Sequence, residues 1–389
     1  MGDNENDSYS ESSTQSWGSR LMDSIKGVGI GFILFILSFV VLWWNEGRSV
    51  HTYKSLKEGK GATVEAKADS VDSGNEGKLV HVSGMASTEE TLSDSVFNVR
   101  APKALSLRRT VTMYQWQENC KSESEKNLGG SKTTTTKCTY EKAWAGKTDS
   151  SKFKKPTGHK NPEMLYESQT VVADSAKIGA YKLPKDLTGR LAQFSALENS
   201  EEILRQVKAV AAKPAAVTGE GIYIGSNASA PQIGDYRIKF EAVRPMDASV
   251  IAVQQGGTFA PFQAKAGDQI YMITAGSVTA QQMFKQAESA NATLTWILRL
   301  VGWLLMAIGI YMLFSPFVTL LDVVPFLGSI LGFGIGLASA VLSLSLSLVT
   351  IAIAWMFYRP VLSVILIAAV VGIVFFFRQR AAQKKAAAG

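Results

Sequence analysis

The side chains best suited to chemistry in this chain are three histidines and two cysteines: His51, His81, His159, Cys120 and Cys138. Catalysis and metal binding need several such groups brought together at characteristic spacings. His159, in the segment GHKNP, is the best candidate, but no spacing of His, Cys, Asp and Glu in the sequence matches a metal site. The sequence also has no nucleophile-elbow or P-loop motif. We therefore expect no catalytic residue, no metal site and no cofactor, and predict that the chain is not an enzyme.

The two cysteines can meet across a β-hairpin. They lie in two runs with the alternation of strands, 107–120 and 131–144, and a turn rich in Gly separates the runs. If residues 128–130 form a three-residue loop, the numbers of facing residues sum to 258, and Cys120 lies opposite Cys138. This register predicts a disulfide bond. A one-residue bulge would separate the two sulfurs, and a buried free thiol is the alternative.

An apolar run near the N-terminus predicts the first membrane helix, 27–45. Its 19 uncharged residues end in Trp43 and Trp44, and indole rings prefer the membrane interface. A signal peptide has a shorter apolar region, a basic leader and a small-residue cleavage site, so we interpret the run as a retained anchor. The polar, acidic residues 1–19 cannot form a core, and we predict that the segment 1–26 is disordered and cytoplasmic.

An almost uncharged block, 294–377, predicts three more spans. The 22 uncharged residues after Arg299 are enough to cross a hydrocarbon layer of about 30 Å. The next uncharged stretch has 36 residues, which is too long for one straight crossing and tight for two. We expect spans at about 296–314, 340–357 and 361–377.

Residues 325–339 are predicted to form a shallow Gly-rich segment before the third span, with Pro325 at its start. Small residues recur here at a spacing of four, which aligns them on one helical face: Gly328, Gly332, Gly336 and Ala340. We call these four residues the Gly stripe. Such a stripe lets another backbone approach closely. The partner is either a helix of a second subunit in a homo-oligomer or a neighbouring helix of the same chain.

The charges beside the spans predict the topology. Four spans place both chain ends on one side, and the tail 378–389 carries a basic cluster, which marks that side as cytoplasmic. Residues 46–293 then face the periplasm or, in a eukaryote, the lumen. Such compartments are oxidising and permit a disulfide.

The segment 46–293 is predicted to fold as a β-rich domain, because runs of β-branched and aromatic residues alternate with Asn and Gly turn signals. One helix is expected at 200–212. Thr279 and Gln282 form a capping-box pattern that opens a helix continuing into the second span. We interpret NEGR (45–48) as a turn. The predicted fold class is α+β: an α-helical membrane bundle of four spans with a large, mostly antiparallel β-rich extracytoplasmic domain.

Five segments together resemble the LUMA family of four-span membrane proteins: NEGR after the first span, NEGKLVHVSG at 75–84, LRRTVTMYQWQE at 107–118, GHKNP at 158–162 and WMFYRP at 355–360. The resemblance implies a large luminal or periplasmic domain and cytoplasmic termini. In animals it implies residence in the endoplasmic reticulum and inner nuclear membrane, self-assembly, and organisation of other membrane proteins. The chain looks like a bacterial relative, for which we expect the inner membrane with a periplasmic domain.

These observations favour a multi-pass membrane scaffold. The expected partners are the lipid bilayer, further copies of the chain and unidentified membrane proteins. A nucleic-acid partner is not expected, because the net charge of +7 is dispersed and no RNA- or DNA-binding signature is present. The alternative is a homo-oligomeric channel or pore. Transport sites usually place ionisable groups inside the spans, and the predicted spans contain none apart from Arg299, near one end of the second span.

Overall fold

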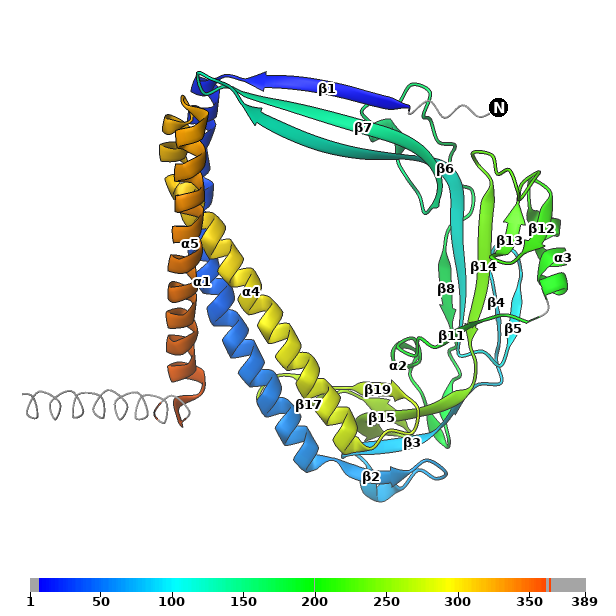
Figure 1. The fold of residues 1–389 in the computed structure, drawn as a ribbon. Helices are drawn as coiled ribbons and strands as arrows, with labels where there is room; N and C mark the ends of the chain where they lie inside the picture. The colour runs from blue at the N-terminus through cyan, green and yellow to red at the C-terminus, as the bar shows by residue number, and fades with distance from the viewer. Residues whose placement is uncertain (1–6, 199, 362–363, 365–389) are drawn as a thin grey trace, which may run out of the picture.

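Three long helices and a β-rich domain close a frame in this computed structural model, which describes residues 7–198, 200–361 and 364 (Figure 1). The long helices are α1 (Trp17–Ala62), α4 (Ala280–Leu321) and α5 (Pro325–Tyr358). All three are long and apolar enough to cross a membrane. The fourth predicted span, 361–377, and the basic tail, 378–389, lie almost wholly outside the described residues.

The helix boundaries differ from the predicted ones in two places. The predicted spans 27–45 and 296–314 are interior parts of α1 and α4, and NEGR lies inside α1 instead of in a turn. α5 runs without a break through its glycines, so its 34 residues are about 51 Å long. The sequence predicted two separate segments there, 325–339 and 340–357. Glycine lowers helix propensity by only about 1 kcal/mol per residue, which packing against α4 offsets.

The capping box predicted at the start of α4 is confirmed. The Thr279 hydroxyl accepts from the backbone N–H of Gln282, and the Gln282 side chain accepts from the backbone N–H of Thr279. From this cap α4 continues without interruption from the β-rich domain into its apolar half. The domain and the helical bundle are therefore joined through a continuous helix.

The domain consists of two main sheets and two small ones. The eight-stranded sheet comprises β1 (Ser8–Gln15), β7 (Lys132–Ala145), β6 (Ser106–Lys126), β14 (Tyr236–Val243), β13 (Gly221–Ile224) and β12 (Ala215–Thr218) in that order, with β8 (Gln169–Val172) on β6 and β11 (Phe194–Ala196) on β14. The seven-stranded sheet comprises β10 (Tyr181–Lys182), β9 (Lys177–Ile178), β3 (Leu79–Ser87), β15 (Met246–Gln255) and β16 (Thr258–Ala260), with β19 (Met272–Ala275) on β15 and β2 (Val64–Lys67) on β3. The small sheets pair β4 (Thr91–Ser93) with β5 (Arg100–Pro102) and β17 (Phe262–Gln263) with β18 (Gln269–Ile270).

The predicted preference for antiparallel pairing is confirmed, since β2–β3 is the one parallel pair among the described strands. Two short helices, α2 (Lys185–Thr188) and α3 (Ser200–Val210), and the 3-10 turns η1 (Ser73–Asn75) and η2 (Ser150–Lys152) complete the domain.

An apolar cluster joins the domain to the C-terminal end of α1 and the N-terminal end of α4. It contains Leu56 of α1, Phe284 of α4 and Ile270 of β18. This cluster anchors the helices at one end.

A long arm reaches the other end of the helices. We define the arm as β1, β7 and the distal half of β6, from residue 116 to 126 (Figure 1). Strand β6 has 21 residues and is about 70 Å long. At the arm's tip the N–H of Gly129 donates to the carbonyl of Val323 at 3.1 Å, in the corner between α4 and α5. The β-rich domain is thus attached to the helical bundle at both ends.

Residues 8–26 are ordered where the sequence predicted disorder, and residues 1–6 of the same prediction lie outside the described residues. Residues 8–15 form β1 and α1 begins at Trp17, with the Ser16 hydroxyl as its N-cap. Disorder was expected because this segment is polar and cannot form an apolar core. A polar strand can nevertheless pair with another polar strand, because the side chains of the two strands hydrogen-bond to each other. Ser and Thr hydroxyls face each other across β1 and β7, as in the Ser12–Thr135 pair at 2.9 Å.

The β1–β7 pairing also bears on the predicted topology. Paired strands lie in one aqueous compartment, so this pairing is incompatible with a membrane that separates residues 8–15 from 132–139. A polar three-stranded sheet cannot cross hydrocarbon, because its edges and side chains would lose their hydration. Helix α1 therefore cannot carry residues 8–15 to the opposite side of a bilayer while β1 stays paired.

A cross-link tests the β1–β7 pairing in membranes. In a chain whose native cysteines are replaced by Ser, the variant Ser12→Cys/Thr135→Cys should form a disulfide under mild oxidation, because these residues are Cα partners. The matched control is Ser12→Cys/Ser122→Cys, since β6 lies two strands from β1, about 10 Å away. Gel mobility before and after reduction is the measurement. Labelling of residue 12 from the cytoplasm alone, without a cross-link, would restore the predicted topology.

The hairpin register is as predicted. Cys120 is the Cα partner of Cys138, the facing residues of β6 and β7 sum to 258, and the structure joins the two sulfurs in a disulfide. Mass spectrometry of the unreduced protein digest should recover the two Cys peptides as one linked species. The double variant Cys120→Ser/Cys138→Ser should lose about 3 kcal/mol, given a sequence separation of 18. Alkylation of both thiols without reductant would contradict this.

Candidate functional site

A polar junction lies where the three long helices meet. Its centre is Glu46 of α1, whose side chain is fully buried and bonded twice to Arg299 of α4. Arg299 Nε lies 2.7 Å from Glu46 Oε1, and Arg299 Nη2 lies 2.9 Å from Oε2. Trp355 of α5 donates its indole N–H to Oε2 at 2.7 Å. One carboxylate therefore holds all three helices, since a buried charge must be paired and hydrogen-bonded.

Two aromatic rings flank the guanidinium of Arg299. Its central carbon lies 4.7 Å from the ring centroid of Trp296 and 5.6 Å from that of Trp355. Cation–π contact stabilises a guanidinium that is shielded from water. This explains how a charge near the predicted second span is tolerated.

The two polar neighbours of Glu46 also bond across to α4. Asn45 donates to the carbonyl of Thr295 at 3.0 Å. Arg48 donates to the side-chain oxygens of Asn291 at 2.9 Å and Thr295 at 3.1 Å. Arg48 has no carboxylate within 4.0 Å among the residues that the structure describes, and its Nε is buried without a hydrogen-bond partner there. It is a cation whose charge is not compensated by a neighbour, in contrast to Arg299.

Gly47 allows α5 to pack closely on α1. A Cβ built at this position would lie 2.8 Å from the Tyr358 ring, which is closer than real Cβ contacts come. The rings of Trp43 and Tyr358 pack together with their centroids 5.8 Å apart. Each residue of NEGR thus has a partner on α4 or α5. The sequence motifs NEGR and WMFYRP, more than 300 positions apart, form one site.

Sequence reasoning identified both motifs but missed that they meet. Nothing local links Glu46 to Arg299 or Trp355, because the separations are 253 and 309 residues. The available signal was an acidic residue directly after one apolar run and a basic residue directly before another. Opposite charges at membrane boundaries pair in this way.

A second polar cluster closes the other end of the bundle. Asp322, at the C-terminal end of α4, is buried and forms ion pairs with Arg20 of α1 and, at 2.7 Å, with Lys126 of the arm. Gly328 makes room for it, because a Cβ there would overlap Asp322 Oδ1. Trp17 donates its indole N–H to the carbonyl of Thr319 at 2.9 Å. This cluster ties the N-terminus, the arm and the α4–α5 corner together.

His159, the best candidate for chemistry, has a structural environment. Its Nε2 lies 2.5 Å from Asp7 Oδ2, its Nδ1 lies 2.8 Å from the Lys155 carbonyl, and its ring stacks on Tyr140 at 3.9 Å. The bonds to His159 and Lys155 hold the pKa of Asp7 below its usual value. Burial, with a hydrogen bond to Glu118, raises the pKa of Tyr140 to about 12. Both groups therefore keep their ordinary ionisation at neutral pH, and the cluster docks the start of β1.

Among the described residues, a carboxylate lies close to the two cysteine sulfurs. Glu118, Cys120 and Cys138 lie close enough together to resemble a metal site. The two sulfurs are bonded to each other, so they offer no thiolate to a metal ion.

His81 is also held by structural hydrogen bonds. Its Nδ1 lies 2.5 Å from Glu65 Oε2, and its Nε2 lies 2.9 Å from the Val278 carbonyl. These contacts hold β3 beside β2 and the start of α4.

The Gly stripe makes contacts within the chain. Gly328 lies against Asp322, and a Cβ at Gly332 would lie 3.3 Å from Val318 of α4. The carbonyl of Ala340 accepts from the Trp303 indole at 3.3 Å. A Cβ at Gly336 would meet no atom within 4 Å among the residues that the structure describes. Of the two alternatives that the sequence left open, packing against a neighbouring helix of the same chain accounts for these three members, and oligomer contact stays a prediction for Gly336.

Comparison with known proteins gives consistent matches. A sequence profile of the family Transmembrane protein 43 matches residues 113–360. The mouse protein Transmembrane protein 43 is 32% identical over 360 residues, which cover 88% of this chain and 86% of the mouse protein. The human protein is 31% identical over 374 residues, covering 91% and 90%. A Drosophila homolog is 31% identical over 291 residues, covering 72% and 74%. No solved structure matches.

These relatives are animal proteins, so the comparisons give no support to the expected bacterial origin. Their names describe a transmembrane protein and no enzymatic activity.

The Glu46–Arg299 pair should be essential for stability. Glu46→Gln leaves the Arg299 charge buried without its partner, and we expect it to lower stability by about 3 kcal/mol or more. Glu89→Gln is the matched control, because Glu89 and its partner Lys103 are both exposed, and a loss below about 1 kcal/mol is expected. Denaturant unfolding in mild detergent, followed by tryptophan fluorescence, measures both. Equal losses would show that the junction contributes no more than a surface pair.

Proposed function

The chain belongs to the Transmembrane protein 43 family and is an integral membrane protein, and from this premise we propose that it is a scaffold that self-associates and organises partner proteins at the membrane. This family is the LUMA family that the sequence resembles. The proposal assigns partner binding to the β-rich domain and self-association to the membrane helices.

The observation that supports a scaffold is the attachment of the β-rich domain at both ends of the bundle. The apolar cluster around Phe284 holds one end, and the Asp322 cluster holds the other. A domain attached at two points has a defined orientation relative to the helices. A scaffold needs such a defined orientation to hold its partners, and a domain attached through one flexible linker would lack it. The acid–base candidate His159 is hydrogen-bonded on both ring nitrogens, to Asp7 and to the Lys155 carbonyl, which supports a structural role for it.

The arm offers a surface for partners. Among the described strands, β1 is the edge of the eight-stranded sheet, so its outer backbone groups can pair with a strand of a partner. Its side chains are mainly Ser, Thr and Glu. Such an edge suits a polar extended segment more than an apolar one.

We also propose residence in the endoplasmic reticulum and inner nuclear membrane, with the arm on the luminal side. The animal relatives support the eukaryotic location, and the Cys120–Cys138 disulfide supports an oxidising compartment.

The alternative function, a pore, has less support, because the charges of Glu46 and Arg299 neutralise each other. The Ser343 and Ser345 hydroxyls bond back to their own helix.

Self-association through the Gly stripe is tested at its open member. Gly336→Leu should reduce the particle mass in mild detergent, because a large side chain there prevents close approach of a second helix. Gly334→Leu is the control: its Cβ position is equally open among the described residues, and it lies about 200° around the helix from Gly336. Mass photometry or light scattering measures the mass. If neither variant changes it, the assembly contact lies outside the stripe; equal reductions would indicate general disruption of α5.

A further inference from the structure

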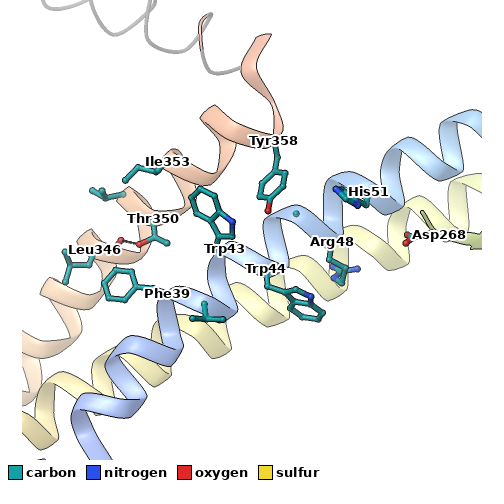
Figure 2. A pocket seen from close by; sticks show the side chains of 13 residues that line it. Phe39, Trp43, Trp44, Arg48, His51, Asp268, Leu346, Thr350, Ile353 and Tyr358 are labelled. Atoms are coloured by element: carbon teal, nitrogen blue, oxygen red, sulfur yellow. Dashed lines mark hydrogen bonds between the residues drawn. The ribbon is translucent and has the colours of Figure 1, made fainter. Parts of the chain in front are cut away.

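A pocket of about 830 Å³ opens beside the polar junction, between α1 and α5 (Figure 2). One part of its wall is apolar and includes Phe39, Leu346 and Ile353. Another part carries Arg48, His51 and Asp268. The pocket therefore changes from apolar to charged along its length, as the molecules of a lipid monolayer do.

The charged part of the pocket lies just past the apolar run of α1, which is where a helix in a bilayer meets the lipid headgroups. The apolar run of α1 ends at Asn45, and the tryptophans that line the pocket, Trp43 and Trp44, stand directly before it. Arg48 and His51 follow at about 4.5 and 9 Å along the helix axis. Cationic and imidazole groups at this height can reach phosphate, while the apolar wall lies deeper.

The charges of the pocket are complementary to a zwitterionic headgroup. Arg48 has neutral hydrogen-bond partners only among the described residues, so its positive charge is free to attract a phosphate. His51 is exposed, and its ring lies 6.2 Å from that of Tyr358. Asp268, in the turn between β17 and β18, forms no ion pair within 4.0 Å in the described part of the chain and brings a negative charge to the same pocket. A second headgroup anion would be repelled by Asp268, whereas an ammonium group would be attracted.

We propose that this pocket binds one zwitterionic glycerophospholipid, with the phosphate at Arg48 and His51, the headgroup amine at Asp268 and an acyl chain along Phe39, Leu346 and Ile353. The site goes beyond the scaffold function. It is formed within one subunit, from α1, α5 and the β17–β18 turn, and does not require assembly. The bound lipid would lie beside the junction, in the pocket whose wall includes Gly47 and Tyr358.

Native mass spectrometry of the full chain in mild detergent tests the site. The probes are dioctanoyl phosphatidylethanolamine and dioctanoyl phosphatidylglycerol, added separately at the same concentration. The wild-type chain should retain one phosphatidylethanolamine and bind phosphatidylglycerol at least several-fold more weakly. Arg48→Gln should weaken binding of both lipids by about tenfold, because a charge-assisted hydrogen bond to phosphate is lost.

Asp268→Asn provides the decisive variant, since the Asp268 side chain forms no ion pair or hydrogen bond with the junction in the described part of the chain, and the change keeps its size. It should remove or invert the preference for phosphatidylethanolamine without loss of folding. Asp247→Asn, at an exposed position outside the pocket, is the matched control and should leave the preference unchanged. If Arg48→Gln does not fold, His51→Gln takes its place, because His51 is exposed. Equal retention of both lipids by the wild-type chain and every variant would show nonspecific annular lipid only and would overturn the proposal.

Discussion

The buried pair of Glu46 and Arg299 is the interaction on which the arrangement of the helices depends. An unpaired charge in this apolar bundle would cost several kcal/mol, so α1 and α4 can adopt only the register that brings the two side chains together. The indole N–H of Trp355 donates a further hydrogen bond to the same carboxylate, and this bond fixes the position of α5 along the other two helices. Small residues permit this geometry, since Gly47 accepts the ring of Tyr358 and Gly302 accepts Leu42 at a distance that no Cβ would allow.

The register of the bundle is transmitted to the β-rich domain because α1 and α4 continue into it. Their ends pack in the cluster of Leu56, Ile270 and Phe284. At the opposite end, Asp322 binds Arg20 and Lys126, which belong to the N-terminus of α1 and to the arm. The apolar cluster and the Asp322 cluster lie at opposite ends of the helices, so the polar domain and the apolar bundle form one closed frame (Figure 1). The membrane must accommodate a bundle whose two ends are both tied to this domain.

The β6–β7 hairpin shows how far local reasoning extends. Its register follows from alternation and from two glycines with positive φ in the turn, so the Cys120–Cys138 pairing was predictable without any tertiary information. The start of α4 was predictable for the same reason, since a capping box involves residues three apart. The family could also be predicted, because its motifs occur in order along the chain. Strand β1 could not, since its partner β7 lies more than 100 residues away and its polar composition resembles disorder.

The sequence by itself determined the apolar helices, the antiparallel strands, the hairpin register and the family, because each depends on neighbours a few residues apart or on composition. Only the tertiary structure decided that NEGR is helical, that α5 continues through its glycines and that Glu46, Arg299 and Trp355 form one site. The physical reason is that a buried charge is stabilised by whichever group folding brings to it. That partner lies 253 residues away, where neither propensity nor periodicity reports on it.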